Sequence, residues 1–126
     1  MSARTTSHRP TVLVVDDDPD VRGILGIILA NEEYEVVTAV DGAAALEYAS
    51  DPRIGLILLD IQMPRLEGDA FCRAYRERGG RAPVLVMTAL DIDAATVARI
   101  GADGYLPKPF DIEPALETIR RLVDAR

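Results

Sequence analysis

The chain has 126 residues, of which 48% are apolar, and its formal net charge is −7 at pH 7. The length and apolar content are typical of one domain with a single core, whereas the acidic balance argues against direct binding to nucleic acid or to an anionic membrane surface. The one cysteine, Cys72, excludes an internal disulfide and favours a reducing cytoplasmic environment.

The first ten residues are polar and lack periodicity, which predicts a flexible tail at 1–10 followed by one domain at 11–126. Five short apolar segments follow along the chain. Their Val-, Leu- and Ile-rich composition is typical of strands that are covered on both faces. The predicted strands are Thr11–Val15, Glu35–Ala39, Ile54–Leu59, Val84–Met87 and Gly104–Leu106.

Helical signals follow each predicted strand. Asp18 and Pro19 provide an N-cap and a proline at the first helical position, and apolar residues then recur at helical spacing up to Leu29. Further helices are predicted at 42–49, 68–78, about 92–100, and from 112 to the C-terminus. The alternation predicts an α/β fold, a doubly wound parallel sheet of the flavodoxin-like type with order 2-1-3-4-5 and helices on both faces.

Polar residues interrupt the apolar pattern where the predicted strands end. In parallel sheets these ends share one edge, and ligands bind beyond it where the strand order reverses. We therefore expect the following side chains to lie close together: Asp16, Asp17 and Asp18 after the first strand, Asp60 after the third, Thr88 after the fourth and Lys108 after the fifth.

The acidic residues among them predict a metal site. Clustered carboxylates repel one another unless a cation lies between them, and Mg²⁺ prefers oxygen ligands, with Mn²⁺ as a possible substitute. Helix capping explains Asp18, but it does not explain why a lone Asp60 ends an apolar strand. Asp16, Asp17 and Asp60 are thus the candidate metal ligands.

Asp60 is also a candidate nucleophile, because a carboxylate that attacks phosphorus forms an acyl phosphate. The Lys108 ammonium and the Thr88 hydroxyl are candidates for binding the phosphoryl oxygens. The alternatives are a solvated lysine and a strand-end threonine that bonds its own backbone. Pro109, directly after Lys108, is a candidate for a cis peptide bond.

Four segments resemble the receiver domain of two-component response regulators. They are Val14–Asp18, Leu58–Pro64, Met87–Ala89 and Gly101–Phe110, and they occur in the expected order and spacing. The resemblance covers roughly residues 11–124, which is nearly the whole chain.

The resemblance implies a role for each matching position. Asp60 corresponds to the phosphorylated aspartate, Asp17 to a direct Mg²⁺ ligand and Asp16 to a ligand through water. Gln62 corresponds to the residue whose backbone carbonyl completes the metal site, and Lys108 to the phosphate-binding lysine.

Other matching positions imply a switch. Thr88 corresponds to the switch hydroxyl and Tyr105 to the aromatic residue that changes rotamer with it. Pro109 corresponds to the usually cis proline, and Gly68 to a turn glycine. Gln62 and Leu90 occupy the two positions that tune how long the phosphoryl group survives.

The implied function is a cytoplasmic signalling phosphoacceptor rather than an enzyme, with self-catalysed phosphotransfer and autodephosphorylation. The donor would be the phosphohistidine of a sensor histidine kinase or histidine phosphotransfer protein. Phosphorylation would switch a face formed by the fourth helix, fifth strand and fifth helix, which then binds a downstream protein target. No direct contact with nucleic acid or membrane is expected, and the oligomeric state would be a monomer or a weak phosphorylation-dependent dimer.

Two alternatives stay open at this point. The chain is a stand-alone regulator, or it is the receiver portion of a longer one with a DNA-binding or enzymatic output. Gly104 stands where many DNA-binding regulators carry an acid, which weakens the case for their form of dimer. An Asp-nucleophile phosphatase is more remote, since that family needs a second acid where this chain has Gln62.

Overall fold

The computed structural model describes residues 10–61, 68–89, 92–109 and 111–124. Most of the predicted tail lies outside these residues, as do Gln62 and Leu90. Strands and helices alternate along the described chain, in the order β1 Thr11–Val15, α2 Pro19–Asn31, β2 Glu35–Ala39, α3 Gly42–Leu46, β3 Ile54–Asp60, α4 Gly68–Glu77, β4 Val84–Thr88, α5 Ala94–Ile100, β5 Gly104–Pro107 and α6 Ile112–Asp124.

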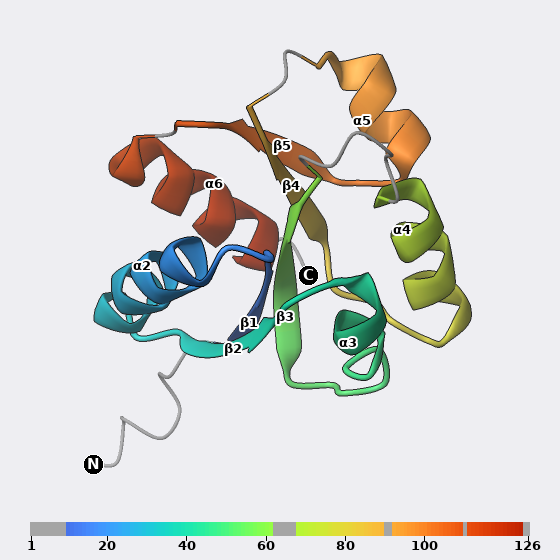
Figure 1. The fold of residues 1–126 in the computed structure, drawn as a ribbon, viewed down its shortest axis with the longest axis horizontal. Coiled ribbons are helices and arrows are strands. Elements are labelled where there is room, and N and C mark those ends of the chain that lie inside the picture. Colours follow the sequence, from blue (N-terminus) through green and yellow to red (C-terminus); the bar gives the residue numbers. More distant parts are fainter. Residues whose placement is uncertain (1–9, 62–67, 90–91, 110, 125–126) are drawn as a thin grey trace.

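The strands form one parallel sheet with the order β2-β1-β3-β4-β5, which confirms the predicted fold class. The chain first winds outward from β1 to β2 and then returns to the other side of β1 through β3. The strand order therefore reverses between β1 and β3, where doubly wound sheets bind their ligands. Figure 1 shows the sheet between two layers of helices.

Alternating side chains divide the core between the two faces of the sheet. On one face Val14 and Leu58 pack with α2 and α6, and on the other Val15 and Leu59 pack with α3, α4 and α5. Figure 1 shows α2 and α6 together on one side of the sheet and the other three helices opposite. The strands β1 and β4 are buried throughout, and edge strand β2 is partly exposed.

The helices α3 and α5 differ at one end from the sequence prediction. The helix predicted at 42–49 ends at Leu46, because the following amides bond three residues back, as Ala49 N–H does to the Leu46 carbonyl at 3.1 Å. The helix predicted from about residue 92 begins at Ala94, since Asp93 caps it by accepting from Thr96 N–H at 2.9 Å.

The predicted cap of the first helix is confirmed. The Asp18 carboxylate accepts a 2.9 Å hydrogen bond from Asp20 N–H, and Pro19 is the first helical residue. This cap starts α2 immediately after the acidic turn, which comprises residues 16–18. Within the described residues, no helix has both the length and the apolar character needed to cross a membrane.

Candidate functional site

The turn after β1 gives its three acidic residues different environments. Asp16 is buried, and its Oδ1 accepts a 2.9 Å hydrogen bond from Asp18 N–H. Asp18 caps α2, and Asp17 between them is exposed. The turn thus holds one carboxylate inside the edge of the sheet and presents the next one to solvent.

The register of the sheet brings Asp60 to this turn. Val14 pairs with Leu58 and Val15 with Leu59, so that Asp16 and Asp60 each follow a paired position. Val14 and Leu58 belong to the same core cluster, and because side chains alternate, Asp16 and Asp60 leave the sheet on the same side. The side chain of Asp60 is only 12% exposed.

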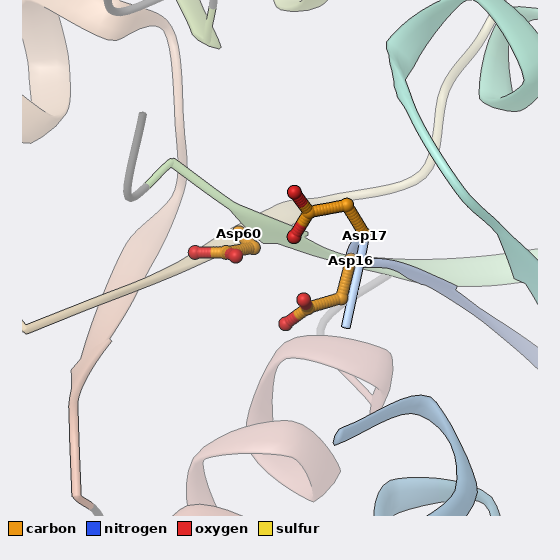
Figure 2. Close-up of side chains that lie close together, drawn as sticks. All are labelled: Asp16, Asp17 and Asp60. Atoms are coloured by element: carbon orange, nitrogen blue, oxygen red, sulfur yellow. The ribbon is translucent and has the colours of Figure 1, made fainter. Parts of the chain in front are cut away.

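The three carboxylates converge in space. One oxygen from each of Asp16, Asp17 and Asp60 lies within 4.8 Å of the others. Figure 2 shows these side chains close together at the carboxyl ends of the neighbouring strands β1 and β3. Opposite oxygens around one Mg²⁺ ion are separated by about 4 Å, so this donor set fits a single hard divalent cation.

Lys108 joins this cluster from the far side of β4. Its Nζ lies 3.4 Å from Asp16 Oδ2 and 3.5 Å from Asp60 Oδ1, and its side chain is 18% exposed. The backbone N–H of Lys108 donates a 2.7 Å hydrogen bond to the Thr88 carbonyl, and the Lys108–Pro109 peptide bond is cis. A mostly buried ammonium thus lies between carboxylates from two strands.

Among the described residues, the charge in this cluster is unbalanced. Three carboxylates there meet one ammonium, that of Lys108, and two of the carboxylates, those of Asp16 and Asp60, are largely withdrawn from water. A divalent cation would offset the remaining negative charge, which is the situation that favours metal binding at clustered acids. The acidic cluster is therefore compatible with Mg²⁺.

Thr88 and Tyr105 lie on the adjacent strands β4 and β5. Thr88 ends β4 and is fully buried, one residue beyond the pairing of Met87 with Asp60. Tyr105 pairs with Val86 and packs, half-buried, against the core cluster beneath α3, α4 and α5. Because Val86 and Thr88 are two residues apart, Thr88 and Tyr105 share one face of the sheet.

Two predicted site residues cannot be placed in this arrangement, since Gln62 and Leu90 lie outside the described residues. Gly68, the predicted turn glycine, is the first residue of α4. A cleft beside the acids is lined by residues of the β1–α2 turn, the β2–α3 turn, α3 and α4, including Asp17, Gly42 and Phe71. The Asp17 carboxylate is thus reached from solvent along this cleft.

Sequence reasoning missed one residue at this site. Arg22 of α2 reaches back over the turn, and its Nη1 donates a 2.7 Å hydrogen bond to the main-chain carbonyl of Asp16. A signal was present in the sequence, because a cation near the start of a helix opposes the helix dipole and so needs a specific partner.

Comparison with known proteins identifies the family. The model of the family described as "Response regulator receiver domain" matches residues 12–120. Response regulator MprA of Mycobacterium ulcerans is 45% identical over 114 residues, which cover 89% of this chain and 49% of that protein. The chain thus spans about half the length of the curated relatives it matches.

Solved structures agree with this assignment. Chemotaxis protein CheY4 of Vibrio cholerae superimposes with a TM-score of 0.80 at 34% identity, covering 90% of this chain and 98% of that one. Response regulator TrrA of Thermotoga maritima, solved in complex with Mg²⁺-BeF, has a TM-score of 0.76 at 31% identity, with coverages of 90% and 98%. The chain therefore belongs to the family of response regulator receiver domains of two-component systems.

Proposed function

We propose that Asp60 accepts a phosphoryl group from the phosphohistidine of a sensor histidine kinase or a histidine phosphotransfer protein. The observation that carries this proposal is the convergence of three carboxylates within 4.8 Å, with Lys108 Nζ 3.5 Å from Asp60. This combination supplies a nucleophile, a cation site and a fixed positive charge at one point.

In the proposed step, a carboxylate oxygen of Asp60 attacks phosphorus, and the phosphorus–nitrogen bond of the donor breaks. The bonding electron pair remains on the imidazole nitrogen, which takes up a proton, and Asp60 becomes an acyl phosphate. Lys108 stabilises one phosphoryl oxygen, and the Thr88 hydroxyl donates a hydrogen bond to another.

A bound Mg²⁺, or Mn²⁺ in its place, would neutralise charge on the phosphoryl oxygens during transfer. Asp17 and Asp60 would hold the ion directly, Asp16 through water, and Gln62 through its backbone carbonyl. The different environments of Asp16 and Asp17 support this division. The buried Asp16 carboxylate already has protein partners on both oxygens, whereas that of Asp17 is exposed.

The output we propose is a change of shape on the face formed by α5, β5 and α6. Thr88 moves toward the phosphoryl group, Tyr105 changes rotamer, and the face then binds a downstream protein. The position of Thr88 and Tyr105 on one side of the sheet supports this coupling. The phosphoryl group selects between two existing arrangements, and Gln62 and Leu90 tune its lifetime through autodephosphorylation.

We propose that this receiver occupies residues 11–126; most of the tail predicted at 1–10 lies outside the described residues. It acts in the cytoplasm as a monomer or weak phosphorylation-dependent dimer, without direct contact to nucleic acid or membrane. The second candidate is that it serves as the receiver part of a longer regulator, which the half-length match to MprA favours. The length of the native open reading frame distinguishes a stand-alone receiver from the receiver part of a longer regulator.

Intact mass measured after treatment with acetyl phosphate and Mg²⁺ tests the phosphoacceptor proposal. The wild-type chain should gain one phosphoryl group, and Asp60→Asn should gain none. Asp93→Asn is the matched control, because it changes an exposed carboxylate outside the cluster and should be phosphorylated like the wild type.

Equal labelling of Asp60→Asn and wild type would refute Asp60 as the acceptor. Chelation of the metal should abolish labelling of the wild type. Incubation with a phosphate ester distinguishes a receiver from an Asp-nucleophile phosphatase. A phosphatase would hydrolyse many ester molecules, whereas a receiver would stop at one phosphorylated adduct.

A further inference from the structure

Arg22 occupies a position that a cation ordinarily avoids. It is the fourth residue of α2, close to the positive end of the helix dipole. Its guanidinium turns back across the start of the helix and donates a 2.7 Å hydrogen bond to the carbonyl oxygen of Asp16 in a partly buried setting. A hydrogen bond from a charged donor is stronger than a neutral one, which offsets the unfavourable position.

The carbonyl that Arg22 binds belongs to the peptide group joining Asp16 to Asp17. Because a peptide group is planar, holding its oxygen also fixes the direction in which the chain enters Asp17. The Asp17 side chain is exposed, and the described part of the chain offers its carboxylate no hydrogen bond. The main chain therefore fixes the position and direction from which the Asp17 side chain leaves the backbone.

The other contacts of Asp16 involve its N–H and its side chain, and not the peptide group that joins it to Asp17. The Asp16 N–H donates to the Ala39 carbonyl at 3.1 Å, and the side chain bonds Asp18 N–H and Lys108. These contacts hold the Asp16 side chain and the peptide group before it. The guanidinium of Arg22 holds the peptide group after it, which leads to the proposed metal ligand.

We infer that Arg22 is a positioning residue, which orients Asp17 for metal binding through the main-chain carbonyl of Asp16. This inference rests on the proposed Mg²⁺ site. It assigns Arg22 no contact with the ion or with the phosphoryl group. Its effect is to hold the acidic turn in the shape that the cation requires before the cation arrives.

A purely electrostatic role makes the opposite prediction. A positive charge beside a cation site repels Mg²⁺, so removing it would strengthen binding if charge were the main contribution. If the hydrogen bond to the carbonyl is the main contribution, removing Arg22 weakens binding. The sign of the change in Mg²⁺ affinity thus separates the two roles.

The experiment is a Mg²⁺ titration of the full chain followed by backbone amide NMR. Residues that support metal ligands typically change affinity by about 10- to 100-fold when removed. We expect Arg22→Ala to bind Mg²⁺ about 10-fold more weakly than wild type. Arg22→Lys should fall between them, since lysine keeps a charged donor but lacks the planar guanidinium.

Arg120→Ala is the matched control. Arg120 is a partly exposed arginine of α6 that pairs with Glu32 at 3.4 Å, at the other end of α2 from the acidic turn. It should leave the Mg²⁺ affinity at the wild-type value. Urea unfolding of each variant shows whether the fold persists, and Arg22→Lys carries the test if Arg22→Ala does not fold.

The two proposals fail in distinguishable ways. If wild type shows no Mg²⁺-dependent shifts in the acidic turn, the metal site of the proposed function is wrong. If wild type binds Mg²⁺ and Arg22→Ala binds it as tightly or more tightly, only the positioning role is overturned. Weakened binding in Arg22→Ala, with partial recovery in Arg22→Lys, supports it.

Discussion

Asp16 and Asp17 are adjacent and chemically identical, yet the fold gives them different capacities. Protein donors occupy both carboxylate oxygens of Asp16, from Asp18 N–H at 2.9 Å and Lys108 Nζ at 3.4 Å. The Asp17 side chain, in contrast, is exposed to solvent. A side chain that is already bonded on both oxygens is suited to a supporting role, and an exposed neighbour is suited to direct coordination.

Cys72 shows how burial controls reactivity at the scale of a single residue. It is 3% exposed within the core, and burial raises the pKa of its thiol from about 9.0 to about 11. The thiolate is the reactive form, and desolvation disfavours it. Cys72 is therefore a packing residue of the hydrophobic core.

We predict that the folded chain reacts with iodoacetamide at pH 8 at least about 100-fold more slowly than the chain unfolded in urea, given the higher thiol pKa. Cys72 is the one cysteine of the sequence, so intact mass reports it alone. Comparable rates in the two states would contradict the buried thiol.

The raised pKa of Cys72 also affects stability. Above pH 9.0 the unfolded chain releases the thiol proton, whereas the folded chain retains it up to about pH 11. Unfolding then releases a proton, so stability falls as pH rises through this window. Cys72→Ala should lose less stability than wild type between these pH values, as measured by urea unfolding.

At the scale of elements, the short helices depend on their caps. Asp41 accepts a 2.8 Å hydrogen bond from Ala44 N–H at the start of α3, and Asp93 caps α5 in the same way. A helix of five to seven residues has little stability by itself because nucleation is costly. The hydrogen bond from Thr96 N–H also lowers the pKa of Asp93.

The end of α4 is held by a buried aromatic residue. Tyr75 is 1% exposed, stacks on Phe71 with 5.8 Å between ring centroids, and accepts a 3.1 Å hydrogen bond from Ala82 N–H through its hydroxyl. Arg76 covers the ring at 5.3 Å. The ring therefore has little freedom to move, and Gly80 lies directly against it.

We predict that Gly80→Ala destabilises the protein by about 1–3 kcal/mol, because the added Cβ would overlap the Tyr75 ring. Gly23→Ala is the matched control. An added Cβ there meets no atom within 4 Å, and alanine in helix α2 should stabilise by about 0.5–1 kcal/mol. Urea unfolding measures the free energy of unfolding of both variants. Equal stability of Gly80→Ala and wild type would show that the Tyr75 ring moves aside without cost.

At the scale of the whole molecule, the sheet concentrates negative charge at one edge. The chain has a net charge of −7, and three of its carboxylates meet within 4.8 Å beside Lys108. The hydrophobic core must hold these groups together against their repulsion. A ligand that binds the folded state alone should therefore stabilise the entire domain.

We predict that Mg²⁺ raises the melting temperature of the chain by a few degrees, because a free concentration of about ten times Kd stabilises the folded state by about 1.4 kcal/mol. Asp17→Ala should lose this increase, and Asp93→Asn should keep it. A melting temperature that does not respond to Mg²⁺ in the wild type would contradict the metal site.

Much of this molecule follows from local sequence patterns. The strand β1 and the cap of α2 are local features, since they depend on apolar runs and on short-range bonds such as that from Asp20 N–H to Asp18. The candidate site residues were chosen because they follow strand ends. Helix ends were predicted less well, since the tightened turn after α3 depends on hydrogen bonds that composition does not reveal.

Local sequence patterns specify which elements form and which kinds of side chain stand at their ends. Two contacts depend instead on the complete fold. Asp16 and Lys108, 92 positions apart in the chain, lie 3.4 Å from each other, and Arg22 binds the Asp16 carbonyl. The physical reason is that strand order, register and side-chain direction result from packing the whole core, whereas caps and apolar periodicity act between neighbours in the chain.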